Sequence, residues 1–411
     1  MRKKILIVSQ HFWPESFRIN DICDYLAGRG CDIDVLCGIP NYPQGKFFDG
    51  YSWFRNRKQE HGGARIRRAL EIPRRGNSNP MIFINYLSFP LSSLFHLPRL
   101  MVGKYDRIFI YQTSPVMMAL AGLLAGKLTR TETTMYVGDL WPQNLYSVID
   151  VKDPALRRLA EAVSSWHYRQ ADKLIANSTR LAERLGQITS LPEDRIAFIP
   201  QCCEKFYERD APDAELERRF AGGFNIVYAG NISPAQSFET VIASARRLKE
   251  DGARDINWII VGDGMSRPWL ESAVAAAGLA GNFFFEGQQP AAEIPRYHTI
   301  ADALLACLVK SDLLDLTIPS KVLSYFAAGK PLLLAMDGEA QTLVREAGCG
   351  FAAGSGDSGA LYENIRKLRA LPAAERQAMG ARGRDYHFRH FERNANMDRL
   401  YDFVFDLIPE H

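Results

Sequence analysis

Residues 199–223, IPQCCEKFYERDAPDAELERRFAGG, break an otherwise regular alternation of short β-branched runs and longer helical patterns. The segment is polar and rich in turn-forming residues, and the hydrophobic run FNIVYAG (224–230) restarts the alternation directly after it. Such a break is typical of a connection between two folding units. It predicts a first domain at 1–204, a linker at 205–222, a second domain at 223–385 and closing C-terminal helices at 386–411.

On both sides of this segment the chain has the pattern of an α/β fold. The strand-like runs include KILIVS (4–9), DIDVLCG (32–38), DRIFIYQ (106–112) and TTMYVGD (133–139), then INWIIVGDG (256–264), NFFFEG (282–287) and KPLLLA (330–335). Strands that alternate with helices form parallel sheets with right-handed crossovers. We therefore expect two Rossmann-like, doubly wound domains, which also suits a length of 411 residues.

The composition excludes several classes of protein. Lysine and arginine total 50 against 47 for aspartate and glutamate, so no overall charge points to nucleic acid. The seven cysteines are scattered without the spacing of metal ligands, which argues against structural zinc and suits a reducing compartment. The first apolar run is too short for a secretory signal. We expect a cytoplasmic protein without nucleic-acid partners.

The strongest local signal for a ligand is IPSKVLSYFAAGKPLLLA, residues 318–335. It predicts a helix that begins near Ser320, after a loop at the carboxyl edge of a parallel sheet, where free N–H groups attract phosphate. A lysine in the first turn, Lys321, interacts unfavourably with the helix dipole, and a bound anion would compensate for this. Ser320, Lys321 and Val322 are therefore candidate phosphate contacts. The alternative is an ordinary capped helix that packs on the sheet.

Three further strand ends in the second half are candidate ligand contacts, because loops at this edge face the crevice of an open α/β sheet. They contribute Gly230 with Asn231, Gly262 with Arg267, and Glu286 with Gly287. The run around Gly262 lacks the third glycine of a dinucleotide fingerprint, which disfavours a hydride-transfer enzyme.

In the first half, the loop QHFWPESFRIN (10–20) follows the first strand and is rich in functional side chains: His11, Trp13, Glu15 and Arg18. Asp139 ends a later strand in VGDLWPQN. Either Glu15 or Asp139 could take a proton from an acceptor, although Asp139 could equally be a capping aspartate. Asp32 and Asp34 lie within a strand, and we interpret them as structural rather than metal-binding.

Residues 81–101 are strongly apolar but include Asn85, Pro90 and His96, so they do not predict a spanning helix. An arginine cluster precedes them, and we expect an amphipathic element beside a cationic patch that docks on an anionic membrane surface. The alternative is a buried helix. The candidate membrane contacts are Arg67, Arg68, Arg74, Arg75, Phe89 and Phe95.

Taken in order, these motifs resemble the GT-B glycosyltransferases of the large retaining family 4, and within it the bacterial surface-polysaccharide N-acetylfucosaminyl transferases. The resemblance spans nearly the whole chain through HFWPESFRIN, GIPNYPQG, VGDLWP, ADKLIANS, VYAGNIS, VGDG, FEGQ and PSKVLSYFAAGKP. It implies two Rossmann-like domains that face a cleft, and a peripheral position on the inner face of the cytoplasmic membrane.

The resemblance also implies the substrates and their sites. A UDP-linked N-acetyl amino-deoxyhexose would lie on the second domain, with its diphosphate over Ser320 to Val322 and its base near Glu286. A polyprenyl-diphosphate-linked saccharide would lie on the first domain, near His11, Trp13, Arg18 and Asn41. Transfer would keep the anomeric configuration, with Lys321 at the leaving group and Asp139 or Glu15 at the acceptor, and would need no metal or cofactor.

Two departures from the family pattern matter. Leu316 and Ser324 stand where many members have two glutamates, and Pro234 to Gln236 replace an arginine and a lysine after the strand VYAG. Lys321, the helix dipole and Arg267 would then have to stabilise the charge on the leaving diphosphate. Two alternatives remain open: a UDP-sugar 2-epimerase with the same architecture, and an inactive nucleotide-binding scaffold.

Overall fold

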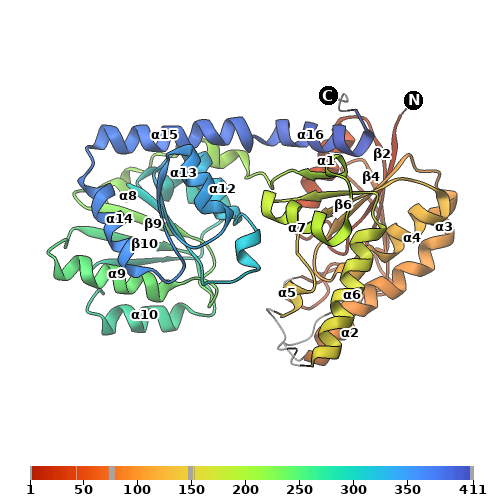
Figure 1. Cartoon of the computed structure of the whole chain (residues 1–411), viewed down its shortest axis with the longest axis horizontal. Coiled ribbons are helices and arrows are strands. Elements are labelled where there is room, and N and C mark those ends of the chain that lie inside the picture. Colours follow the sequence, from red (N-terminus) through yellow and green to blue (C-terminus); the bar gives the residue numbers. More distant parts are fainter. Residues whose placement is uncertain (1, 43, 74–78, 147–150, 152, 408–411) are drawn as a thin grey trace. The chain divides into compact units, whose positions relative to one another are not determined.

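The computed structural model describes residues 2–42, 44–73, 79–146, 151 and 153–407 (Figure 1). The chain forms two compact units, unit 1 from Met1–Ile199 with Met397–His411, and unit 2 from Pro200–Asn396. The segment predicted as a linker belongs to unit 2, where it forms a helix that Asp213 caps and that buries Leu216.

Unit 1 is built on an eight-stranded sheet in the order β3-β4-β2-β1-β5-β6-β7-β8. All neighbours are parallel except β3 and β4. The strands are β1 (Lys4–Val8), β2 (Asp32–Cys37), β3 (Lys58–His61), β4 (Ala64–Arg68), β5 (Arg107–Gln112), β6 (Thr133–Val137), β7 (Lys173–Ala176) and β8 (Ile196–Phe198).

Helices cover both faces of this sheet. The helices are α1 (Arg18–Gly28), α2 (Asn79–Ser93), α3 (Leu97–Val102), α4 (Leu120–Thr129), α5 (Gln143–Tyr146), α6 (Pro154–Gln170), α7 (Thr179–Thr189) and α16 (Arg393–Phe405), with short 3-10 turns η1 (Leu94–His96), η2 (Val116–Ala119) and η3 (Glu193–Arg195). On one face α1 and α16 share a core with alternate strand residues such as Ile5 and Ile7. On the other, Gly122 of α4 lies against Val8 and Ile110.

Unit 2 has a six-stranded, fully parallel sheet in the order β11-β10-β9-β12-β13-β14. The strands are β9 (Phe224–Ala229), β10 (Ile256–Val261), β11 (Phe283–Gly287), β12 (Ala303–Cys307), β13 (Leu332–Ala335) and β14 (Gly350–Ala353). The helices are α8 (Ala214–Arg219), α9 (Phe238–Glu250), α10 (Arg267–Ala276), α11 (Ile294–Thr299), α12 (Ser320–Ala328), α13 (Glu339–Ala347), α14 (Ser358–Ala370) and α15 (Ala373–His390), with turns η4 (Lys205–Glu208), η5 (Ala291–Glu293) and η6 (Leu314–Leu316).

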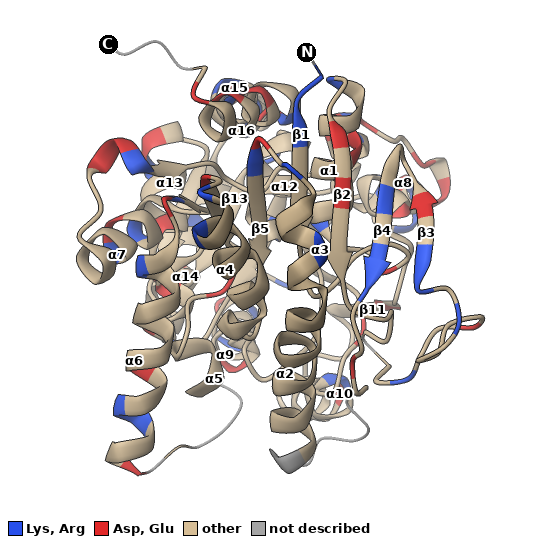
Figure 2. Ribbon diagram, turned by 90° about the vertical axis from the view of Figure 1, so that its right-hand side faces the viewer, with Lys and Arg blue, Asp and Glu red and all other residues tan. Residues whose placement is uncertain are grey.

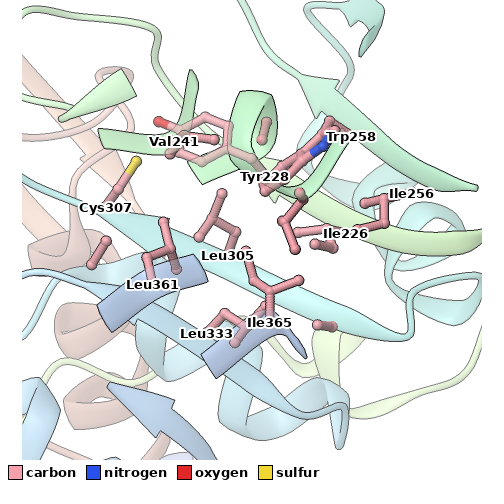
Figure 3. Close-up of a cluster of buried hydrophobic side chains, with 14 of the residues drawn as sticks. Ile226, Tyr228, Val241, Ile256, Trp258, Leu305, Cys307, Leu333, Leu361 and Ile365 are labelled. Carbon is pink, nitrogen blue, oxygen red and sulfur yellow. The ribbon is translucent and has the colours of Figure 1, made fainter. Parts of the chain in front are cut away.

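The helices of unit 2 again form two layers. Helices α9 and α14 pack together on one face, and α12 and α15 pack together on the other, above the strands in Figure 1. The strands and the first layer enclose a core of buried side chains that includes Tyr228, Trp258 and Cys307 (Figure 3). This arrangement confirms the predicted fold class of two doubly wound α/β domains.

The strand orders show where ligands are expected. In unit 1 the chain reverses direction across the sheet between β1 and β5, and in unit 2 between β9 and β12. Loops at the carboxyl ends of the strands that flank such a reversal line the crevice of a doubly wound fold. The loop after β1 and the loop after β9 are those that the sequence singles out.

Candidate functional site

Glycine turns meet at the carboxyl edge of the unit 2 sheet. Gly230 follows β9 and Gly262 follows β10, and their φ angles of 151° and 139° are left-handed. A Cβ on Gly262 would lie 1.9 Å from the Gly230 carbonyl oxygen, so a larger residue does not fit. The Gly262 N–H donates to the Gly287 carbonyl at 2.8 Å. The predicted contacts Gly230, Gly262 and Gly287 therefore form one continuous backbone surface.

Lys321 reaches this edge from the first turn of α12. Its Nζ donates to the hydroxyl of Tyr228 and to Oε1 of Gln236, each at 2.8 Å, and lies 4.1 Å from the centre of the Tyr228 ring. Exclusion of water from the ammonium lowers its pKa from 10.5 to about 8. Within the part of the chain that the structure describes, no carboxylate forms an ion pair with it. A cation thus stands at the strand ends with only neutral partners.

The first turn of α12 is open to a ligand. No side chain caps the helix, Ser320 is exposed and Val322 is buried against the core. Free N–H groups at such a start attract anions. The structure thus puts Ser320 and Lys321 beside solvent, whereas the Val322 side chain is a packing residue.

Two further predicted donor contacts already have partners. The Glu286 carboxylate accepts two bonds from Arg219, at 2.7 and 3.0 Å. Arg267 pairs with Glu271 at 2.8 Å and with Asp263 at 3.3 Å, but remains partly exposed. Asn231 is exposed beside them. Glu286 is therefore held in place, whereas Arg267 keeps solvent-facing area.

In unit 1, Glu15 organises the loop after β1. Its buried carboxylate accepts the backbone N–H groups of Asn41 and Tyr42, each at 2.7 Å, and lies 3.0 Å from Nδ1 of His11. The His11 ring stacks on Phe17 at 4.7 Å. Three of the predicted residues, His11, Glu15 and Asn41, thus form one cluster, in which Glu15 orients its neighbours.

Trp13 lies within the same loop, and Arg18 follows it directly. The Trp13 ring stacks on His61 of β3, 4.0 Å between centres, and the backbone N–H of Trp13 donates to Oδ1 of Asn20 at 2.9 Å. Arg18 begins α1 and is half-buried. The loop is therefore tied to both the sheet and the helix.

Asp139 lies after β6 with one carboxylate oxygen 2.9 Å from the hydroxyl of Ser114. That hydroxyl also accepts bonds from Trp141 at 3.0 Å and Asn144 at 2.6 Å. Burial raises the pKa of Asp139. The Asp139 carboxylate is thus tied to Ser114, and its role toward an acceptor stays a prediction.

Sequence reasoning missed Glu71, which lies after β4 and is buried, and whose Oε2 accepts no hydrogen bond from the described residues. Its Oε1 accepts a bond from Gln10 at 2.8 Å and one from Asn85 of α2 at 3.3 Å. Burial raises its pKa to about 6. A lone glutamate in an arginine-rich run has no pattern that predicts this position, but Gly38 is a signal in hindsight, since a Cβ there would lie 1.9 Å from Oε2.

The apolar segment forms a two-sided helix. α2 has no charged residue along its length (Figure 2), and its inward side chains are Ile82, Asn85, Tyr86 and Phe89. The outward ones, Phe83, Ile84, Leu87 and Leu91, are exposed, and Phe95 of η1 is 86% exposed. Arg57, Arg67 and Arg99 lie close enough to His96 to lower its pKa, together with burial. An apolar surface therefore adjoins a group of arginines.

Two of the predicted membrane contacts are wrong. Phe89 is fully buried because it is on the inner side of α2. Arg68 is buried because β4 turns it inward, where it donates to the carbonyl of Trp13 at 2.7 Å. Arg67 is half-buried, and Arg74 and Arg75 lie outside the described residues. Within the described ranges no helix is both long and apolar enough to cross a bilayer.

Family models match both halves of the chain. The "Glycosyl transferase 4-like domain" matches residues 16–202, and "Glycosyl transferases group 1" matches residues 217–386. Together they span most of the sequence, and between them only residues 203–216 are left unmatched.

Several relatives are similar in sequence. The Escherichia coli protein WcaI, whose name describes it as a colanic acid biosynthesis glycosyl transferase, is 25% identical over 79% of this chain and 81% of its own. The 2-deoxystreptamine glucosyltransferase of Streptomyces kanamyceticus is 30% identical over 51% of this chain and 55% of its own. Pseudomonas aeruginosa WbjE, named as a glycosyltransferase, is 22% identical over 72% of this chain and 74% of its own.

Solved structures share the fold. Sucrose-phosphate synthase from Thermosynechococcus elongatus superposes with a TM-score of 0.73 at 16% identity, over 99% of this chain and 100% of that one. Anabaena HepE in complex with UDP gives 0.71 at 14% identity, over 99% and 100%. WaaG, a glycosyltransferase involved in lipopolysaccharide biosynthesis, gives 0.66 at 14% identity, over 98% and 99%.

Proposed function

The chain is a glycosyltransferase of the GT4 type with a GT-B fold, and on that premise we propose that it extends a lipid-linked saccharide in surface-polysaccharide synthesis. The donor is a UDP-linked N-acetyl amino-deoxyhexose such as N-acetylfucosamine, and the acceptor is a polyprenyl-diphosphate-linked saccharide. The similarity to WcaI supports the pathway, and the UDP in the HepE structure supports the nucleotide. The relatives are transferases, which disfavours the epimerase alternative.

The observation on which the proposal depends is Lys321, a cation with neutral partners beside the Gly230 turn and the open start of α12. A half-buried charge without a counter-ion is unfavourable, and a bound anion offsets that cost. The donor diphosphate fits this need, with its oxygens over Lys321 Nζ and the first N–H groups of α12. Because Arg219 occupies the Glu286 carboxylate, we place the nucleobase against the backbone around Gly287.

In the proposed reaction, the bond between the sugar and the diphosphate breaks as the acceptor hydroxyl attacks from the same face, and the departing diphosphate takes the proton. Lys321, the α12 dipole and Arg267 stabilise the charge that develops on the leaving group, with no metal required. Asp139 contacts the acceptor hydroxyl, because Asp139 is only half-buried whereas Glu15 is buried and holds the backbone of Asn41 and Tyr42.

We also propose that unit 1 meets the membrane surface through the outer side of α2 and η1. The exposed apolar side chains enter the interface and Arg57, Arg67 and Arg99 attract anionic headgroups. A polyprenyl-linked acceptor resides in that membrane, so this contact places it near the loop after β1.

Calorimetric titration of the purified chain with UDP, GDP, dTDP and ADP tests the donor site, with Lys321→Ala as the variant. We expect selective binding of UDP that weakens at least tenfold in Lys321→Ala. A chain that binds none of the four nucleotides would overturn the proposal. Nucleotide binding without transfer to any lipid-diphosphate acceptor would refute the catalytic part and favour the inactive nucleotide-binding scaffold.

A further inference from the structure

We propose that Tyr228 and Gln236 are positioning residues that hold the Lys321 ammonium at the Gly230 turn, so that the donor diphosphate meets a cation already in place. The inference rests on the proposed function, because the diphosphate is its ligand. It gives a role to Gln236, which lies in the stretch Pro234 to Gln236 that replaces an arginine and a lysine of the family pattern, and to Tyr228 on the preceding strand.

We call the groups that hold the Lys321 ammonium its seat: the Tyr228 hydroxyl, the Tyr228 ring and Oε1 of Gln236. The Tyr228 hydroxyl and Gln236 Oε1 each accept a hydrogen bond at 2.8 Å, and the face of the Tyr228 ring lies below at 4.1 Å. The fourth side is the Gly230 turn, where a Cβ would stand 3.0 Å from Nζ. Lysine has three N–H donors, so after these two bonds one donor remains for a ligand.

The chemistry of the seat preserves the charge of the ammonium. A hydroxyl, an amide oxygen and an aromatic face attract a cation without neutralising it. A carboxylate in either place would form an ion pair with Lys321 and repel a diphosphate. The two neutral side chains therefore position the ammonium and leave its full charge for the ligand.

Tyr228 is itself rigidly held. Its ring is fully buried in the unit 2 core and packs edge-on against Phe238 at 4.9 Å. Its hydroxyl lies 2.7 Å from the Asn231 carbonyl and 3.0 Å from Gln236 Oε1, so it also ties the loop after β9 to the strand. Preorganisation of this kind lowers the cost of ordering the site when the ligand binds.

Tyr228→Phe and Gln236→Met test the seat, and Tyr325→Phe is the matched control. Tyr325 of α12 is equally buried, and its hydroxyl contacts the backbone of Ala229, the residue that follows Tyr228 in β9. Its hydroxyl bonds do not include Lys321. UDP affinity is measured by calorimetry from pH 6.5 to 9.5, with thermal unfolding as the check on folding. We expect about tenfold weaker UDP binding at pH 7 in both test variants.

The pH profile separates positioning from a structural role. Loss of either acceptor destabilises the protonated form of Lys321 and so lowers its pKa. UDP affinity should therefore decline at a lower pH in both test variants. In Tyr325→Phe it should decline at the same pH as in the wild type. A second test exchanges the partners: Gln236→Lys combined with Lys321→Gln puts an ammonium and an amide across the same contact. It should bind UDP at least tenfold more tightly than Lys321→Gln alone.

The outcomes separate the two proposals. If the wild type binds UDP and Lys321→Ala does not, but Tyr228→Phe and Gln236→Met behave like Tyr325→Phe, the seat is refuted and the proposed function stands. If the exchange variant binds no better than Lys321→Gln, the seat is likewise refuted. A wild type that binds no UDP overturns both.

Discussion

At the scale of single residues, each candidate site depends on an ionisable group whose surroundings change its pKa. Lys321 has a lowered pKa because water is excluded from it, and Glu71 and Asp139 have raised ones for the same reason. Exclusion of water disfavours the charged form in all three cases, and this is typical of functional sites. From these three groups we predict effects on UDP affinity, on the free energy of unfolding and on kcat.

UDP affinity should fall as the pH rises through about 8. The folded-state pKa of Lys321 lies below the ordinary value of 10.5, so the ammonium is lost near pH 8 and with it the attraction for the diphosphate. Calorimetry across pH 6.5 to 9.5 measures the decline. Lys321→Met removes the titrating group and should give weak binding that is flat above pH 7. A wild-type profile that is also flat would contradict a role for the ammonium.

Glu71 should make the free energy of unfolding depend on pH. Its folded-state pKa of about 6 lies above the ordinary 4.5, so its contribution is fully present below pH 4.5 and is lost as the pH rises through 6. The loss amounts to roughly 2 kcal/mol. Urea unfolding gives the free energy of unfolding at pH 4.5 and at pH 7.5. Between these two values the wild type should lose about this much more stability than Glu71→Gln. Parallel pH dependences for the two proteins would refute the raised pKa.

Asp139→Asn should lower kcat by about 100-fold and leave UDP affinity unchanged, because the amide retains the bond to Ser114 but not the charge. Steady-state transfer assays and calorimetry measure the two quantities. The comparison variant is Glu15→Gln, which should mainly lower the melting temperature, since Glu15 holds the backbone of Asn41 and Tyr42. A similar kcat for Asp139→Asn and the wild type would remove Asp139 from the reaction.

At the scale of elements, α2 is unusual because it is apolar on both sides. Its inner side packs on unit 1, and Asn85 there joins it to Glu71 and hence to Gln10 at the end of β1. Its outer side exposes the apolar side chains of Phe83, Ile84, Leu87 and Leu91. α6 likewise exposes Leu156, Leu159 and Trp166 at helical spacing. Apolar patches of this kind mark binding surfaces.

Leu91→Ser combined with Phe95→Ser should reduce flotation of the protein with vesicles that contain anionic lipid by about tenfold, because both side chains are exposed at 58% and 86%. Phe388→Ser is the control, since Phe388 is an exposed aromatic on α15 of unit 2. Equal flotation of the double variant and the wild type would refute the membrane contact.

At the scale of the whole molecule, the final segment of the chain completes the first unit. Met397, Leu400 and Val404 of α16 are buried in the unit 1 core, and Lys173 Nζ donates to the Phe403 carbonyl at 3.0 Å. The C-terminal helices predicted at 386–411 thus divide: α15 starts earlier, at Ala373, and lies within unit 2.

Deletion of residues 397–411 should unfold unit 1 and spare unit 2. Each buried apolar side chain contributes about 1.5–3 kcal/mol, so the loss of several approaches the total stability of a domain. Scanning calorimetry should show one of two unfolding transitions lost in the deletion variant. A single unchanged transition would contradict the division into units.

The sequence by itself determined the fold class and singled out the strand ends that meet at the carboxyl edge of the unit 2 sheet. Alternation of strands and helices dictates parallel sheets, and glycine at 230 and 262 is required wherever two strand ends approach so closely. Lys321 was recognisable because a lysine opposes the dipole at a helix start. These are local properties, and periodicity and residue type are sufficient to reveal them.

Only the tertiary structure decided which side chains meet and which are buried. Strand order places Tyr228 of β9 beside Lys321 after β12, and it brings Glu71 to Gln10 across the first sheet. The pleat of β4 and the orientation of α2 turn Arg68 and Phe89 inward, against the prediction. Composition shows that a segment is basic or apolar, but the direction of a side chain depends on the partner against which its element packs.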